Sequence, residues 1–354
     1  MSVTKSEIES ALRQLALPDG GDLLSRDMVR ALTIDGGAVR FVIEAPSPEI
    51  AKLMEPLRRA AEGVVGRVPG VASVSVALTA HSAPKPAPSL KIGGHPTLQA
   101  GPMKPEGVAR ILAVGSGKGG VGKSTVSSNL AVALARQGRR VGLLDADIYG
   151  PSQARMMGVS ERPASPDGKT IIPLKAHGVT VMSIGLMLDE AKAVVWRGPM
   201  LMGALQQMLG QVAWGELDSL IVDLPPGTGD VAMTLCQKTE LEGAIVVSTP
   251  QDVALLDARK ALDMFATLKT PVLGLVENMS VFTCPHCGGE SHIFGHGGVA
   301  AEAEKLGVPL LAELPIDLET RLAGDAGTPI AAGGSKMAEA YATLAKRLIA
   351  EGHA

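Results

Sequence analysis

The chain has 354 residues, of which 46% are hydrophobic, so it can hold two or three domains with substantial cores. Its formal net charge is -3, only 2% of the residues are aromatic, and no run of Lys and Arg stands out, which disfavours a nucleic-acid-binding protein. Three cysteines are too few for a disulfide framework, so we expect reduced thiols and a cytoplasmic location.

Residues 1–82 predict a small α+β domain. The sequence TKSE at Thr4 resembles a capping box and predicts a helix to about Leu17. Two β-rich runs on either side of Asp35-Gly36-Gly37 predict a hairpin, residues 47–65 have helical spacing, and residues 71–80 alternate as a third strand. The unit contains no cysteine, so we expect a structural or docking role.

Residues 83–107 are rich in Pro and Gly without an apolar period, which predicts a linker. Residues 108–354 then alternate helical stretches with short runs of Val, Ile and Leu that are apolar on both faces. Such runs are typical of buried parallel strands. We therefore expect an α/β unit with a doubly wound, mostly parallel sheet that binds ligands at the carboxyl ends of its strands. The seven expected strands lie at 109–116, 139–147, 179–186, 217–224, 243–250, 270–278 and 308–315.

The first of these strands ends in GKGGVGKST, which matches the phosphate-binding pattern G-x-x-x-x-G-K-[ST]. Glycines allow backbone N–H groups to approach phosphate oxygens, and the following helix directs its positive end at them. Lys123 should reach the β- and γ-phosphates of ATP, and Ser124 should bind Mg²⁺. The predicted nucleotide-binding residues of the loop are Gly117, Lys118, Gly119, Gly120, Val121, Gly122, Lys123, Ser124 and Thr125.

Acidic residues follow two further strands. Asp145 and Asp147 are two positions apart, so in an extended chain they would face the same way. Asp223 follows an apolar run, as expected of a Walker-B carboxylate that holds Mg²⁺ through water. A single Asp after a strand is often only a turn residue, and an Asn at a strand end, such as Asn278, is more often a turn former than a ligand contact.

Cys284 and Cys287 form a Cys-x-x-Cys pair in the stretch FTCPHCGGESHIFGHGG, and four interpretations compete. Flanking Pro, Gly and His argue against a pair of buried apolar cysteines, which suits Cys236 better. A dithiol redox site normally lies at a helix N-terminus, which this sequence cannot readily start. The remaining two are a zinc site completed by His292 and His296, and a site shared by two subunits that holds zinc or an iron–sulfur cluster.

Lys118 gives the loop a second lysine, and the loop thereby resembles the deviant Walker loops of the MinD, ParA and nitrogenase iron protein class. The resemblance implies that Lys118 contacts nucleotide bound by a partner subunit, so that hydrolysis requires a homodimer. It further implies that Asp147 orients the attacking water, that Asp145 lies near the Mg²⁺ shell, that Gly227 senses the γ-phosphate, and that Asn278 contacts adenine. The catalytic residues would be Lys118, Lys123 and Asp147.

The motifs GSGKGGVGKST, LLDADIYGPS, WRGPM, VDLPPGTGD, STPQDVALLDARK and ENMS with CPHCG resemble the Mrp/ApbC family of iron–sulfur carrier ATPases, across residues 108–354. The resemblance implies a slow ATPase whose two subunits share a [4Fe–4S] cluster through Cys284 and Cys287, accept it from an assembly scaffold and pass it to apoproteins. Residues 1–82 resemble the small iron–sulfur-assembly domain but lack the cysteine that some relatives carry near Ser47, which favours docking of a donor or target.

Two alternatives remain from the sequence. One is a zinc-stabilised nucleotide switch. The other is a MinD/ParA-like positioning ATPase that acts on DNA or membrane, which requires a basic patch or an amphipathic anchor. The C-terminal stretch SKMAEAYATLAKRLIAEGHA mixes charges and lacks Trp and Phe, so we expect a docked helix. No apolar run approaches the ~20 residues of a membrane span, and the charged N-terminus does not resemble a signal peptide. We therefore expect neither membrane nor nucleic acid as a partner.

Overall fold

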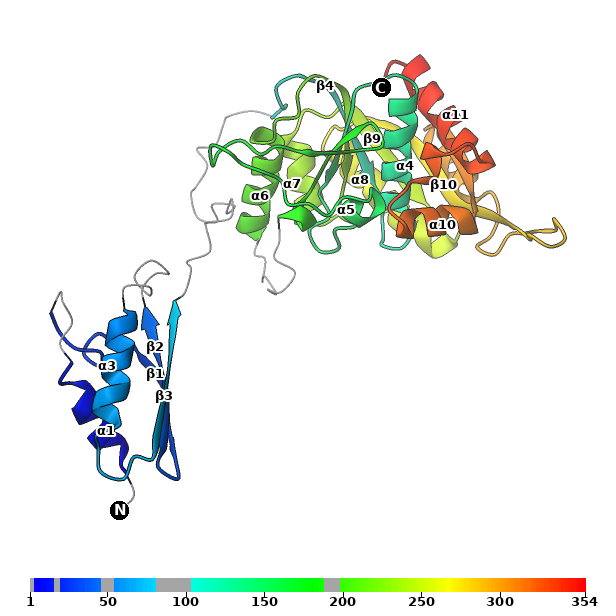
Figure 1. The fold of residues 1–354 in the computed structure, drawn as a ribbon. Helices are drawn as coiled ribbons and strands as arrows, with labels where there is room; N and C mark the ends of the chain where they lie inside the picture. The colour runs from blue at the N-terminus through cyan, green and yellow to red at the C-terminus, as the bar shows by residue number, and fades with distance from the viewer. Residues whose placement is uncertain (1–2, 16–19, 46–53, 81–102, 188–197) are drawn as a thin grey trace. The chain divides into compact units, whose positions relative to one another are not determined.

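The structure, a computed structural model, describes residues 3–15, 20–45, 54–80, 103–187 and 198–354 (Figure 1). The chain divides into two units, residues 1–87 and 88–354. Most of the expected linker lies outside the described residues, as do Ser47 and the first two residues of the WRGPM motif. The predicted ends of the linker therefore stay a prediction.

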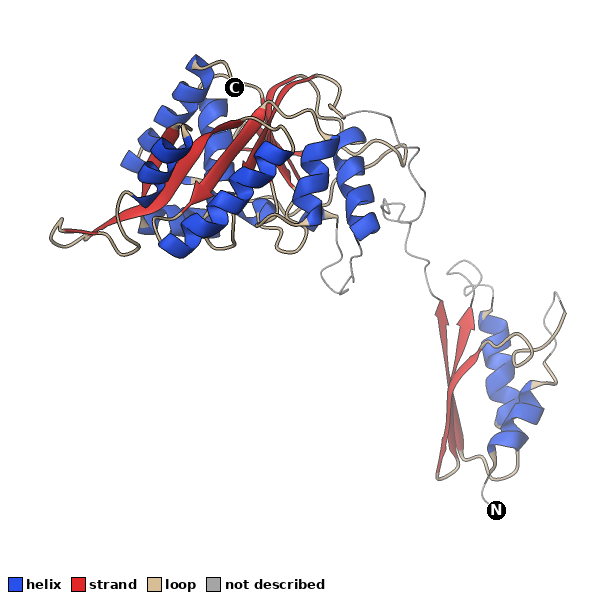
Figure 2. Cartoon of the chain, turned by 180° about the vertical axis from the view of Figure 1, so that it is seen from behind, coloured by secondary structure: helices blue, strands red, loops and turns tan. Residues whose placement is uncertain are grey.

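The small unit is a three-stranded sheet with helices on one face, which confirms the predicted α+β fold (Figure 2). Strands β1 (Val29–Asp35) and β2 (Ala38–Ala45) pair antiparallel, and β2 pairs parallel with β3 (Ser73–Ala80). Helices α1 (Lys5–Leu12) and α3 (Glu55–Val65) pack against each other, and their apolar residues share a core with the sheet.

Two predictions for this unit, the hairpin turn and the end of the first helix, have different outcomes. The hairpin turn forms as expected, because Gly36 and Gly37 adopt the positive φ angles of 54° and 89° that a two-residue β turn requires. Helix α1 ends at Leu12, short of the predicted Leu17, because the next amides form tighter turn bonds, from Gln14 to Ala11 and from Leu15 to Leu12. The Thr4 amide donates to the Glu7 carboxylate at 2.8 Å, as in a capping box.

The large unit contains a mostly parallel sheet in the order β11-β10-β9-β4-β8-β5-β7-β6, and β12 also pairs with β10. Among the strands that the structure describes, only the two short ones, β6 and β11, run antiparallel to their neighbours. All seven predicted strands form, and the doubly wound α/β prediction is confirmed. The strands are β4 (Val108–Gly115), β5 (Val141–Asp145), β6 (Leu174–Ala176), β7 (Val179–Ser183), β8 (Leu217–Asp223), β9 (Gly243–Ser248), β10 (Val272–Thr283), β11 (Glu290–Ser291) and β12 (Leu310–Ile316).

Helices cover both faces of this sheet, and each face has its own apolar core. One core includes Leu205, Leu235, Phe265 and Ala303 from α6, α7, α8 and α9, and the other includes residues of α4 and α11. The helices are α4 (Lys123–Arg136), α5 (Gln153–Met156), α6 (Gly198–Gly210), α7 (Asp230–Lys238), α8 (Asp252–Thr267), α9 (Gly298–Leu306), α10 (Leu318–Asp325) and α11 (Lys336–Ala350), with short 3₁₀ turns η1 (Ile184–Leu186) and η2 (Ile330–Ala332).

Helix α11 is the docked C-terminal helix that the sequence predicts. It packs against α4 and β12, and its apolar stripe includes the buried side chains of Tyr341, Leu344 and Leu348. That stripe is therefore used inside the fold and is not free to act as a membrane anchor. Among the described residues, no helix is both long enough and apolar enough to cross a bilayer.

Candidate functional site

The glycine-rich loop joins β4 to α4 in the strand–loop–helix arrangement that the motif predicts. At Gly117 a Cβ atom would lie 2.0 Å from the carbonyl carbon of Asp257, so no side chain fits there. Gly122 adopts a φ of +84° and immediately precedes the first residue of α4. The unpaired amides of the first helical turn therefore open into the loop, which suits it to bind a phosphate-like anion.

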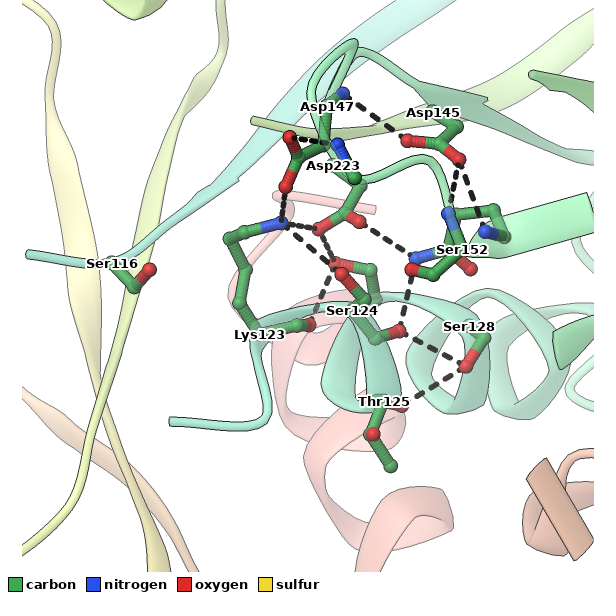
Figure 3. A network of polar contacts seen from close by, with 12 residues as sticks. Ser116, Lys123, Ser124, Thr125, Ser128, Asp145, Asp147, Ser152 and Asp223 are labelled. Atoms are coloured by element: carbon green, nitrogen blue, oxygen red, sulfur yellow. Dashed lines mark hydrogen bonds and ion pairs between the residues drawn. The ribbon is translucent and has the colours of Figure 1, made fainter. Parts of the chain in front are cut away.

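Lys123 and Asp223 form a buried ion pair at the base of this loop. The Lys123 Nζ atom lies 2.7 Å from Asp223 Oδ1, and the two residues are 5% and 0% exposed. The Ser127 hydroxyl donates to the same carboxylate oxygen at 2.8 Å, and Lys123 also donates to Ser124 Oγ at 3.2 Å (Figure 3). Lys123 thus meets two of the three residues predicted to bind magnesium, Ser124 and Asp223.

Asp147 faces the same lysine, at an Nζ–Oδ2 distance of 3.9 Å (Figure 3). Its other oxygen accepts a hydrogen bond from the Gly150 amide at 3.3 Å. Burial raises the pKa of Asp147, while the Lys123 charge opposes that change. Asp147 is thus a buried carboxylate beside the loop, and its predicted role in orienting the attacking water stays a prediction.

Asp145 is held differently from Asp147, contrary to the expectation that the two face the same way. Strand β5 ends at Asp145, and the chain then turns, so that both carboxylate oxygens of Asp145 receive hydrogen bonds from the next segment and from β7. Burial, with repulsion from Asp223, raises the pKa of Asp145 to about 7. The donors are the amides of Asp147, Ser152 and Gln153 and the hydroxyl of Ser183. Asp145 therefore organises the segment after β5, and its predicted place near the Mg²⁺ shell stays a prediction.

Gly227 lies in the loop after β8, directly against the glycine-rich loop. Its amide donates to the Ser116 carbonyl at 2.8 Å, and its φ of +83° is one that glycine adopts without strain. Lys118, on the glycine-rich loop itself, is part-buried and donates to Gln251 Oε1 at 3.5 Å, at the start of α8. Both residues therefore lie at the loop, and their roles as γ-phosphate sensor and partner-reaching lysine stay predictions.

Asn278 lies beneath the glycine-rich loop, on the long strand β10. Its Nδ2 atom donates to the Val121 carbonyl at 2.9 Å, and a Cβ atom at Gly122 would lie only 2.1 Å from that nitrogen. Asn278 is 8% exposed. It is therefore a support for the loop in this structure, and its predicted contact with adenine stays a prediction.

The two motif cysteines lie at the tip of a hairpin formed by β10 and β11. Phe282 pairs with Ser291 and Thr283 with Glu290, the Cys284 amide donates to the Gly289 carbonyl, and the Gly288 amide closes the turn onto the Cys284 carbonyl, each at 2.9 Å. Cys284 is partly exposed and Cys287 exposed. The strand that supports the nucleotide loop through Asn278 thus continues into the cysteine hairpin.

The surroundings of Cys284 and Cys236 shift the pKa of the two thiols in opposite directions. The backbone amide of His286, with that of Cys287 and the Cys287 thiol, lowers the pKa of the Cys284 thiol. Cys236 is buried in α7, and burial raises its pKa to about 12. The hairpin therefore favours the thiolate form that binds metals, whereas Cys236 is an inert core residue, as predicted.

His292 and His296 do not join the cysteines in a metal site. Their rings contact each other at a centroid distance of 4.2 Å, and His292 Nδ1 lies 3.2 Å from the Ser280 carbonyl oxygen. Within the described ranges, no group of three or more His, Cys, Asp or Glu side chains is placed to hold a metal ion. The hairpin thus presents two sulfur donors, those of Cys284 and Cys287.

Gln153 is a site residue that the sequence reasoning missed. It is fully buried, and its Nε2 atom donates both to Asp223 Oδ2 at 2.8 Å and to the Ser124 carbonyl at 3.0 Å. No motif or residue spacing in the sequence marks Gln153 as a site residue, because it is a single glutamine after Gly150-Pro151-Ser152. Its place beside the phosphate loop depends on how the chain turns after β5.

Two family models match the chain in the order that the sequence predicts. One, described as the NUBPL iron-transfer P-loop NTPase, matches residues 107–349, and another, for an iron-sulfur cluster assembly protein, matches residues 5–76. An iron-sulfur cluster carrier protein from Pseudomonas fragi is 53% identical over 242 residues, covering 67% of this chain and 84% of its own length. Another, from Helicobacter pylori, is 41% identical over 335 residues, covering 93% of this chain and 87% of its own length.

The chain is also similar to solved structures of nucleotide-binding proteins and ATPases. A nucleotide-binding protein from Archaeoglobus fulgidus in complex with ADP is 42% identical with a TM-score of 0.56, over 62% of this chain and 87% of that one. The cell division ATPase MinD of Pyrococcus furiosus is 25% identical with a TM-score of 0.53, over 69% and 99% of the two chains. The predicted MinD/ParA-like fold is thereby confirmed. The chain belongs to the iron-transfer P-loop NTPase family, with an iron–sulfur-assembly domain at its N-terminal end.

Proposed function

We propose that this protein is an ATP-hydrolysing carrier that holds a [4Fe–4S] cluster between two copies of itself and passes it to apoproteins. The observation that carries the proposal is the hairpin tip, where Cys284 and Cys287 are accessible and no third ligand joins them among the described residues. The names of the relatives, iron-sulfur cluster carrier proteins, support the same cargo. The cluster is a substrate of the carrier, received from a scaffold and then released.

The half-site suits a carrier for a physical reason. Four thiolates complete a [4Fe–4S] cluster, and a two-fold axis near the hairpin would supply two from each chain. Opening the dimer would remove half of the ligands at once, whereas four ligands from one chain would hold the cluster firmly. Thiolates also require reducing conditions, so we place this chemistry in the cytoplasm, where free cysteines persist.

The nucleotide site supports hydrolysis of ATP. Residues Gly117 to Thr125 would surround the phosphates, with Lys123 neutralising charge that develops in the transition state. Asp147 would orient the attacking water, and Gly227 would respond to the γ-phosphate. Lys118 would reach the nucleotide of the second copy, and Asn278 would contact adenine.

Mg²⁺ fits the residues present. Ser124 Oγ and the buried Asp223 carboxylate both lie within hydrogen-bond distance of Lys123 Nζ, so two oxygen donors of the kind that Mg²⁺ prefers lie close together. Ser124 would bind the ion, Asp223 would hold it through water, and Asp145 would lie close to its shell. When bound, Mg²⁺ neutralises phosphate charge and fixes the phosphate geometry.

Anaerobic reconstitution with iron and sulfide tests the cargo. We expect about four iron atoms per dimer, with a thiolate-to-iron absorption band in the visible range. Cys284→Ala and Cys287→Ala should each lose the band and the iron. Cys236→Ala is the matched control, because this buried thiol lies in α7 and should not affect loading. A full cluster in either hairpin variant would refute the proposal.

A further inference from the structure

Gln153 connects three segments of the nucleotide site through one residue. Its backbone amide donates to Asp145 Oδ2 at 3.0 Å, which anchors the start of α5. Its side-chain nitrogen donates to Asp223 Oδ2 at 2.8 Å and to the Ser124 carbonyl at 3.0 Å. The segment after β5, the end of β8 and the first turn of α4 therefore meet at this glutamine.

The orientation of this amide group is fixed by its neighbours. Both groups that it contacts, the Asp223 carboxylate and the Ser124 carbonyl, can only accept hydrogen bonds when the carboxylate is ionised. The NH₂ end must therefore face them, and the Oε1 end must point away. Oε1 is buried and has no hydrogen-bond partner. Buried polar atoms are rarely left without one, so this oxygen is an acceptor available to a ligand or a water molecule.

The hydrogen-bond partners of Asp223 differ in whether they can keep their contact when nucleotide binds. Oδ1 receives Lys123 and Ser127, whereas Oδ2 receives Gln153. A lysine that moves to phosphate oxygens gives up its contact with Oδ1, while the Gln153 contact involves the other oxygen and need not change. Ser127 and Gln153 are thus the partners that can keep the carboxylate oriented while Lys123 contacts the nucleotide, and among the described residues Gln153 is the one that holds Oδ2.

We propose that Gln153 is a positioning residue for Mg²⁺, which holds the Asp223 carboxylate in place through the hydrogen bond from Nε2 while Lys123 contacts the nucleotide. This inference rests on the proposed nucleotide-binding function. It adds a residue that follows Gly150-Pro151-Ser152 to the magnesium site, which otherwise consists of residues from the phosphate loop and the Walker-B strand. A merely structural role would instead affect folding and nucleotide affinity equally, with or without Mg²⁺.

Equilibrium binding of a fluorescent ATP analogue separates these roles. The affinity is measured with Mg²⁺ and with EDTA for the wild-type protein, for Gln153→Met, which preserves side-chain length without a donor, and for Gln153→Leu. Hydrogen bonds to charged groups are strong enough that we expect the Mg²⁺-dependent gain in affinity to fall about tenfold in both variants, which corresponds to ~1.4 kcal/mol. Affinity in EDTA should stay within about twofold. Gln137→Leu, at an exposed position at the end of α4, is the control and should match the wild type.

Each outcome has a definite meaning. An unchanged Mg²⁺-dependent gain in the variant that folds, checked by thermal unfolding, overturns the role of Gln153 and leaves the proposed function intact. An equal loss of affinity in Mg²⁺ and in EDTA also overturns it, because it indicates a structural role. Failure of the wild-type protein to bind the analogue at all would instead count against the proposed function.

Discussion

The nucleotide loop contacts strand β10 through Asn278, and the cysteine hairpin extends from the end of the same strand, yet the two are built in opposite ways. Around Lys123 and Asp223 the charged groups are buried and satisfied by neighbours from several elements. At the hairpin, Cys287 is exposed, and the tip is supported by the short pairing of β10 with β11 and by turn hydrogen bonds. The first arrangement is preorganised for charge stabilisation, and the second suits binding that must be reversed. The comparison predicts that changes at the loop affect stability and chemistry together, whereas changes at the hairpin affect cargo alone.

The largest effect is expected at Lys123. Lys123→Ala should abolish ATP binding and should also lower the free energy of unfolding by about 3–5 kcal/mol, because Asp223 would remain buried without its cation. Denaturant unfolding and nucleotide titration measure the two consequences. A variant with normal stability would show that the Asp223 carboxylate does not depend on this partner.

Lys118 lies on the same loop as Lys123 but differs from it in burial, so the two lysines can be compared directly. Lys118 is only part-buried, and its contact with Gln251 is long. Lys118→Ala should therefore leave stability and ATP binding nearly unchanged while ATP turnover falls about 10³-fold, as for a charge supplied by a partner subunit. Steady-state hydrolysis with parallel binding measurements tests this. Unchanged turnover would remove Lys118 from the mechanism.

Two glycines of the loop provide a steric test. Gly117→Ala should destabilise the protein by about 3 kcal/mol, because its Cβ would overlap the main chain of α8 at Asp257. At Gly119 the nearest atom to an added Cβ, Pro226 Cγ, is 4.0 Å away. Gly119→Ala should therefore unfold close to the wild-type temperature. Similar melting temperatures for the two variants would contradict the tight packing of the loop on α8.

The sequence predicted the fold because the large unit repeats a simple pattern. Strands buried on both faces read as apolar runs, and all seven such runs form strands. The short strands β6 and β11 were missed, because two or three residues carry no period. Within the described residues the small unit was predicted equally well, apart from the end of α1, where local turn bonds replace helical ones; residues 47–53 of the second expected helix lie outside the described residues.

The site was predicted where a local motif dictates local geometry, as in the glycine loop. It was predicted less well where distant segments meet. Asp145 and Asp147 were expected to face one way, but the turn after β5 separates them. The contact of Asn278 with Val121 and the contact of Gln153 with Asp223 join residues far apart in the chain. Such contacts follow from the tertiary fold and leave no spacing signal.

Asp145 gives the stability of the nucleotide site a pH dependence. Its folded pKa is raised to about 7, while an unfolded Asp titrates near ~3.9. The folded protein holds this proton more tightly, so its stabilising contribution is fully present below about pH 4 and is lost as the pH rises through about 7. We expect the free energy of unfolding to fall by about 1 kcal/mol between pH 6 and 8 relative to Asp145→Asn.

Denaturant unfolding at several pH values measures this difference. Asp167→Asn is a suitable control, because hydrogen bonds, first from the Thr170 amide, lower the pKa of this exposed carboxyl to about 2, outside the tested range. The control should follow the wild-type slope. Parallel slopes for wild type and Asp145→Asn would show that Asp145 is already ionised at pH 6.

The smallest effect is expected at His292, and it bears most directly on how the hairpin is completed. His292→Ala removes one contact to the Ser280 carbonyl and the ring contact to His296, so the loss of stability should be about 0.5 kcal/mol. Closure of the site within one chain would require this histidine as a ligand, and metal content would then fall. Closure by a second copy requires only the cysteines, so iron content should be unchanged, and the iron should elute with the dimer in anaerobic gel filtration.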